Sequence, residues 1–190
     1  MTVDVQQVGK YQGGSRWMSL GGIIGVLALA ASMGGIALDP QKALYSYLIA
    51  FSYWAGIAFA SLILLMIFHA FRAKWMVVIR RPLETMASAV GIFLILFIPI
   101  GMGMEHIYSW VHPSHDLGHE ALHLLHNKAP YLNVKFFLVR TVVYFLIAIF
   151  LAQRFWGWST KQDTSGDVDL TVSQRKLGAG GLPFIALVIS

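Results

Sequence analysis

The chain has 190 residues, of which 57% are apolar and only 12% are charged. Soluble domains carry about 25% charged residues, so this composition, with a mean hydropathy of +0.65, excludes a disordered chain and indicates a membrane protein. The absence of cysteine excludes disulfides, iron–sulfur ligation, cysteine-type zinc sites, c-type haem attachment and thiol nucleophiles. We interpret the net charge of +5 as a sign of topology, because Lys and Arg collect in cytoplasmic loops.

Four apolar runs are long enough for helices that cross about 30 Å of hydrocarbon. After a tail of residues 1–16, we expect a transmembrane bundle over residues 17–158, with helices at 17–38, 43–71, 83–110 and 134–153. Pro99 is expected to kink the third helix. Residues 111–133 form the loop before the fourth helix, and the polar stretch 159–180 is predicted to be a loop. Residues 181–190 are predicted to begin a fifth spanning helix, so we expect an all-α integral membrane protein and the N-terminal portion of a longer one.

Basic residues predict the orientation of this bundle. Three lie on the side opposite the N-terminus, namely Lys42, Lys128 and Lys135. Ten lie on the side of the N-terminus, namely Lys10, Arg16, Arg72, Lys74, Arg80, Arg81, Arg154, Lys161, Arg175 and Lys176. The positive-inside rule therefore places the N-terminus and the polar loop in the cytoplasm, and the 111–133 loop in the periplasm or exterior.

The histidines are the strongest chemical signal in the sequence. Within residues 113–127, helical spacing puts His115, His119, His123 and His126 on one face of a short amphipathic helix. Pairs at i and i+4 have metal-ligand spacing, so this stripe is a candidate zinc or copper site. The alternatives are a polar face that bonds with water, headgroups or a neighbour, and proton buffering at the outer surface.

A haem held by two histidines of this chain is not expected. His69 and His106 are predicted near opposite ends of the membrane, so they do not suit the two axial ligands of one iron. His69 itself is interpreted either as a polar residue at headgroup level or as part of a proton path.

Arg140 is the one charged residue inside the apolar runs that define the predicted spans, namely residues 17–38, 43–71, 85–104 and 136–153. Because it lies near a helix N-terminus, where the dipole disfavours a cation, we expect a carboxylate partner, and Glu105 is the acid at similar depth. Together with His106 and Tyr144, these residues form a candidate polar path for protons from the outer surface. The alternative is that Arg140 only extends its side chain to the headgroups.

Two stretches of the sequence resemble a known family. Residues 46–87 combine an FxxW-type helix that ends in His69 with the turn WMVVIRRPLE, and residues 126–145 contain NKAPYLN before the fourth helix. They resemble the F subunit of Alternative Complex III, a bacterial quinol:electron-acceptor oxidoreductase. The resemblance implies a polytopic subunit of the bacterial cytoplasmic membrane, built as two helix bundles and without catalytic residues or redox cofactors of its own.

The same resemblance implies the partners of the chain. They are a second large membrane subunit that binds menaquinone or another quinone, together with haem c and iron–sulfur subunits on the periplasmic side. The expected role is to scaffold the membrane arm and to contribute a proton half-channel. Two other functions remain as alternatives: a transporter or channel, and a membrane metal-binding protein that uses His115, His119 and His123. Lipids are expected partners in every case, and nucleic acid is not.

Overall fold

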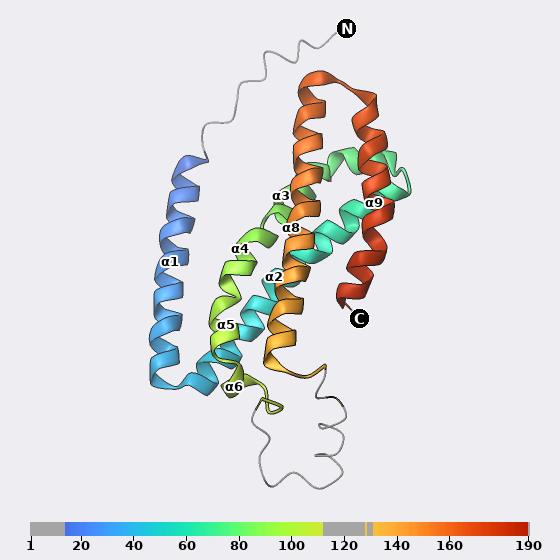
Figure 1. Ribbon diagram of the computed structural model, residues 1–190. Helices are drawn as coiled ribbons and strands as arrows, with labels where there is room; N and C mark the ends of the chain where they lie inside the picture. Colours follow the sequence, from blue (N-terminus) through green and yellow to red (C-terminus); the bar gives the residue numbers. More distant parts are fainter. Residues whose placement is uncertain (1–13, 112–127, 129–130, 190) are drawn as a thin grey trace. The chain divides into compact units, whose positions relative to one another are not determined.

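Four helices of the chain are long and apolar enough to cross a membrane, as the sequence predicts. The computed structural model describes residues 14–111, 128 and 131–189, and all regular secondary structure in that part is helical (Figure 1). The chain divides into two units, Met1–Ala43 and Leu44–Ser190, and each is described by itself.

The first unit contains helix α1 (Ser15–Leu38). Its residues are apolar on all sides and none is buried, which is the pattern of a helix that faces lipid or a partner. The helix ends at Asp39, whose carboxylate accepts a hydrogen bond from the backbone N–H of Lys42 at 3.2 Å. Asp39 therefore caps the next helix, and Pro40 stands at its first position, where a missing N–H is tolerated. The predicted helix at 17–38 is confirmed.

Helix α2 (Pro40–Ala70) confirms the second predicted helix and, from Leu44 onward, belongs to the second unit. Its 31 residues exceed the about 20 that a membrane crossing needs. Two tyrosine hydroxyls fix its beginning: Tyr45 donates to the carbonyl of Ile107 at 3.0 Å, and Tyr47 donates to that of Leu96 at 2.7 Å.

The third segment is less regular than the predicted single helix over 83–110. It consists of α3 (Arg80–Ser88), α4 (Val90–Leu96), α5 (Ile98–Met102) and α6 (Met104–Ile107). Arg80–Met102 as a whole is long and apolar enough to span, as predicted, with short interruptions at Ala89 and Phe97. Pro99 explains the break at Phe97, because it has no N–H and its ring clashes with the preceding turn. Phe97 and Ala89 keep right-handed helical angles, so these interruptions are local.

Helix α8 (Val134–Ser165) confirms the start of the fourth predicted helix. Asn133 caps it by accepting a hydrogen bond from the N–H of Phe136 at 2.8 Å. The predicted end at residue 153 was wrong, because α8 continues for three further turns. The apolar run that gave this boundary ends at the membrane surface, whereas the backbone hydrogen bonds of a helix also persist in water.

The predicted loop at 159–180 is largely helical, and this prediction was wrong too. Gly166 ends α8 in the left-handed conformation with φ +63°, and α9 (Val168–Ile189) begins two residues later. Asp167 initiates α9 by accepting a hydrogen bond from the N–H of Asp169 at 2.9 Å. The residues predicted to start a fifth spanning helix at 181–190 are, as far as residue 189, the later part of α9.

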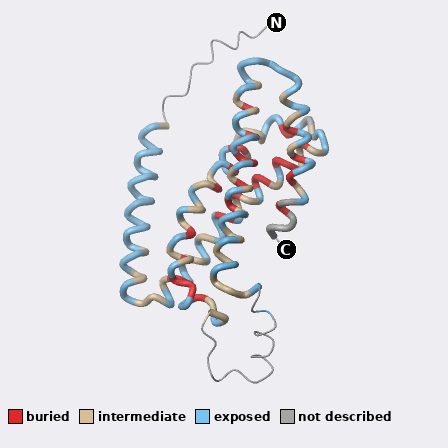
Figure 2. The backbone as a smooth tube through the Cα atoms, in the orientation of Figure 1, coloured by how far each residue is buried: buried red, intermediate tan, exposed pale blue. Residues whose placement is uncertain are grey.

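The core of the second unit lies where α2, α3, α4, α8 and α9 meet, and Figure 2 shows buried residues concentrated there. Leu62, Leu65 and Phe155 are completely buried within it. Two glycines bring α9 close to α2. A Cβ atom at Gly178 would lie 2.8 Å from the carbonyl oxygen of Met66, and one at Gly181 would lie 2.9 Å from its sulfur. At Gly178 the obstacle is backbone, so only glycine permits this approach there.

Candidate functional site

Polar side chains of the second unit gather at one end of its helices. The end of α2, the short 3₁₀ helix η2 (Lys74–Val78), the beginning of α3, the end of α8 and the beginning of α9 meet there (Figure 1). At this level the helices have passed the apolar stretch that a membrane crossing needs. The site is described below from the turn that ends α2.

Helix α2 ends in a Schellman motif, the hydrogen-bonded turn that commonly terminates helices. The N–H of Ala73 donates to the carbonyl of Phe68 at 3.0 Å, and the N–H of Arg72 donates to that of His69 at 3.3 Å. The motif needs one residue in the left-handed region, and Arg72 occupies it with φ +54°. Glycine is the usual residue there, since a side chain at such an angle is strained.

A buried carboxylate connects α3 to the rest of the site. The Glu84 side chain has no solvent exposure, and its two oxygens accept hydrogen bonds from Arg80 at 2.9 Å and from Arg81 at 2.8 Å. Arg80 also donates to the hydroxyl of Ser159 on α8, and Arg81 forms an ion pair with Asp163 on the same helix. The two arginines therefore link α3 to α8 while they neutralise the charge of Glu84.

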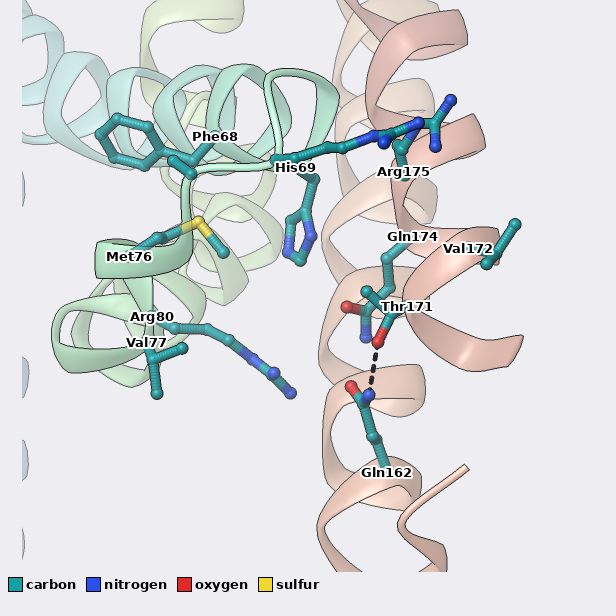
Figure 3. A pocket seen from close by; sticks show the side chains of 12 residues that line it. Phe68, His69, Met76, Val77, Arg80, Gln162, Thr171, Val172, Gln174 and Arg175 are labelled. Atoms are coloured by element: carbon teal, nitrogen blue, oxygen red, sulfur yellow. Dashed lines mark hydrogen bonds between the residues drawn. The ribbon is translucent and has the colours of Figure 1, made fainter. Parts of the chain in front are cut away.

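A cavity of about 500 Å³ opens beside this cluster. Figure 3 shows His69 of α2, Arg80 of α3, Gln162 of α8 and Gln174 of α9 directed into the same space. Arg72, Arg175 and several apolar side chains complete its lining. The ring of His69 stacks on Phe155 beneath the cavity, with ring centroids 5.2 Å apart.

Several polar atoms of the cavity wall have no hydrogen-bond partner among the residues that the structure describes. They are Nε2 of His69, Oε1 of Gln162, and both Oε1 and Nε2 of Gln174. The Nε2 atom of Gln162 is bonded, since it donates to the hydroxyl of Thr171 at 2.5 Å. Buried polar groups in proteins are nearly always paired, so these atoms are candidates to bind a polar group. An amide offers both a donor and an acceptor to that group.

Among the proton-path candidates, His69 and His106 were predicted near opposite ends of the membrane, and the structure separates them in the same way. Glu105 and His106 lie in α6, with Nε2 of His106 3.9 Å from a carboxylate oxygen of Glu105. The hydrogen bond of Tyr45 to Ile107 places α6 beside the beginning of α2. His69 lies 24 residues further along the same helix, which corresponds to about 36 Å. His69 therefore belongs to the cavity at the opposite end.

Arg140 has aromatic neighbours. Its guanidinium carbon lies 4.2 Å from the ring centroid of Tyr131 and 5.5 Å from that of Phe136. The proposed pairing of Arg140 with Glu105 stays a prediction. The electron-rich faces of the rings offset the cost of a cation near the beginning of α8. Tyr144 is half-buried one turn further along that helix.

The histidine stripe at His115, His119, His123 and His126 lies outside the described residues, so the proposed metal site stays a prediction. Among the residues that the structure does describe, no group of three or more His, Asp and Glu side chains is placed to hold a metal ion.

Sequence reasoning missed Gln162, Gln174 and the role of Arg72. Glutamine has no distinctive spacing signal, and Gln174 reaches the cavity only because α9 folds back along α8. One signal could have pointed to Arg72. It occupies the left-handed position that follows α2, and this position can be assigned once the end of the helix is known. Comparisons with protein-family models and with curated proteins gave no match to this sequence.

Proposed function

We propose that this chain is a multi-pass membrane subunit of a respiratory quinol:electron-acceptor oxidoreductase of the Alternative Complex III type. In this role it holds the membrane arm together and contributes to proton movement, while partner subunits carry quinone, haem c and iron–sulfur clusters. The observation that carries the membrane part of the proposal is the exposed apolar surface of its four long helices.

In each of these four helices, at most 28% of the most apolar 18-residue window is buried within the chain. Large side chains such as Trp54, Ile95 and Leu146 are more than half exposed. Contiguous apolar surface of this kind marks contact with lipid or with a partner protein. A chain that places its apolar side chains outward is suited to a site between lipid and neighbouring subunits.

The distribution of basic residues supports the proposed orientation. Within the second unit, the end that contains the cavity carries most of the positive side chains, including Arg72, Arg81, Arg154 and Arg175. The positive-inside rule places this end in the cytoplasm of a bacterium and α6 on the outer side.

The two stretches that resemble the family support the assignment to a respiratory complex. The first, residues 46–87, builds α2, η2 and most of α3, and its turn Trp75–Glu84 supplies the buried Arg80–Glu84 pair. The second, residues 126–145, includes the cap Asn133 at the beginning of α8. In both stretches the resembling residues fix helix ends, which is a structural role expected of a scaffold.

Purification through a tag on this chain in mild detergent tests the proposal. We expect haem c in the redox difference spectrum, and partner proteins with haem and iron–sulfur motifs in constant ratio to the chain. Membranes that express the tag on an unrelated membrane protein serve as the control. A colourless chain that purifies alone would overturn the respiratory assignment and direct the next assays to transport in liposomes and to bound metal.

A further inference from the structure

The cavity between the ends of α2, α8 and α9 has a lining that indicates the charge of its occupant. Arg72, Arg80 and Arg175 line it, and none of the described lining residues is a carboxylate. Arg80 is already paired with Glu84. Arg72 and Arg175 form no ion pair in the described part of the chain, so their charges are available to an anion.

Buried polar groups in the same wall indicate which atoms the occupant presents. Gln174 is 1% exposed, and neither polar atom of its amide has a hydrogen-bond partner within the described part of the chain. His69 is 8% exposed, and its Nε2 atom is likewise unpartnered. Figure 3 shows both side chains directed into the cavity, together with Gln162, whose amide oxygen is also unpartnered. The wall therefore offers donors and acceptors side by side.

The geometry points to a binding site for a hydroxyl-bearing phosphodiester, held as the headgroup of an anionic phospholipid of the phosphatidylglycerol type. Arg72, Arg175 and the amide N–H of Gln174 are suited to the phosphate oxygens, since charge-assisted hydrogen bonds to phosphate are among the strongest in proteins. The amide oxygens of Gln174 and Gln162 are suited to accept from the headgroup hydroxyls. The volume of about 500 Å³ lies within the range of about 300–1,000 Å³ for small-molecule sites.

The position of the cavity favours a lipid over a soluble phosphate ester. It lies at the ends of α2 and α8, which at 31 and 32 residues extend beyond a single membrane crossing. Trp75 and Trp156 are exposed at the same end, and tryptophan is enriched at the level of the headgroups. Basic pockets between helix ends bind anionic headgroups at this level. This inference rests on the membrane placement in the proposed function and not on the respiratory assignment.

Lipid retention by the purified full chain, with any partners that accompany it, tests the site. The chain is incubated in detergent with phosphatidylglycerol or with phosphatidylcholine, and bound lipid is measured by native mass spectrometry. We expect phosphatidylglycerol to be retained at least about tenfold more strongly, because choline offers no hydroxyl to the amide oxygens and brings a positive charge toward the arginines. Glycerophosphoglycerol, the deacylated form of the same phosphodiester, is the soluble ester used for comparison. Binding of this ester in place of the lipid would overturn the lipid assignment.

Three variants connect retention to the cavity. Arg72→Gly removes a guanidinium and places glycine at a backbone angle that suits it, so the fold is kept while retention falls about tenfold. Gln174→Leu removes the buried amide at similar volume and has the same effect. Arg154→Gln is the matched control, because Arg154 stacks on Phe150 outside the cavity. An equal loss in Arg154→Gln, or full retention in Arg72→Gly, would overturn the proposal. Lipid retention is measured on the chain itself. The test of the lipid site therefore stays valid if the chain does not copurify with respiratory partners.

Discussion

At the scale of single residues, the stability of the second unit depends on the buried carboxylate of Glu84. We expect Glu84→Gln to lower the free energy of unfolding by about 3 kcal/mol, because it leaves the largely buried Arg80 without the anion that it shares with the more exposed Arg81. Unfolding in detergent, followed by circular dichroism against denaturant concentration, measures the loss.

The control for Glu84→Gln is an ion pair at the surface. Asp39 pairs with Lys42 at 3.0 Å, but both side chains are largely exposed. Asp39→Asn should therefore change the free energy of unfolding by less than about 1 kcal/mol. If the two variants had equal effects, burial would not determine the contribution of Glu84.

Arg72 leads to a prediction of the opposite sign. Its φ of +54° strains a residue with a Cβ atom, so Arg72→Gly should raise the free energy of unfolding by about 1 kcal/mol. The same denaturation assay measures the change. A decrease would mean that contacts of the arginine side chain outweigh the strain of its backbone.

The sequence was informative about single residues only where a property depends on neighbours along the chain and not on contacts made by folding. It placed His69 at the end of its helix and identified Arg140 as an unusual cation. It did not predict the partner of Arg140, because any nearby carboxylate or aromatic ring lowers the cost of a buried cation. The sequence does not reveal which of these the fold brings within 4.2 Å, and Tyr131 is the group found there.

At the scale of helices, the contact between α9 and α2 depends on Gly178. A Cβ atom there would meet the backbone of Met66 and the side chain of His69. We therefore expect Gly178→Val to lower the free energy of unfolding by about 1–3 kcal/mol, since backbone cannot move aside as a flexible side chain does. Loss of α9 packing should also appear as faster proteolysis between α8 and α9.

Gly180 provides the matched control for this contact. It lies two residues away on the same helix, is exposed, and has no atom within 4 Å of a Cβ position. Gly180→Ala should raise stability slightly, because alanine favours a helix by about 1 kcal/mol over glycine. Destabilisation by both substitutions would contradict a specific contact at Gly178.

The lengths of the apolar runs predicted the spanning helices well. They did not predict how far those helices continue beyond the apolar runs. The chemistry of residues such as Pro40 and Asn133 marks helix starts, and both appear at the beginning of a helix. The end of α8 could not be found in this way, because a helix in water is stabilised by its neighbours and carries no apolar signature. The same limit hid α9, whose packing depends on α2.

At the scale of the whole molecule, the proposed function makes Arg140 a test of proton movement. In the proposed respiratory complex, we expect Arg140→Ala to lower the number of protons translocated per quinol oxidised more than the rate of quinol oxidation. The reason is that a cation near the outer end of α8 sets the local potential for proton entry. Proton uptake and release in liposomes, measured alongside quinol oxidation, give this ratio.

Arg154→Gln is the control for this experiment as well. Arg154 lies on the same helix and over an aromatic ring, with its guanidinium carbon 5.1 Å from the centroid of Phe150, but near the other end. It should leave the proton-to-quinol ratio unchanged. Parallel loss of both activities in Arg140→Ala, together with loss of assembled complex, would assign a structural role to Arg140.

The candidate site was only partly predictable because it is assembled from distant segments. His69 and Arg80 follow each other closely in the sequence, whereas Gln162 and Gln174 join them only after the chain reverses at Gly166. Local patterns carry no information about such a reversal, so they indicate one wall of the cavity and miss the other.

The arginine at the end of α2 has a consequence for laboratory evolution. A selection for heat resistance alone should replace Arg72 by glycine, because the backbone there favours glycine. A selection that also demands growth when anionic phospholipid is scarce should keep the arginine, because the cavity then needs its charge to retain the lipid. Passaging a library of codon 72 under the two regimes would separate what the backbone prefers from what the cavity requires.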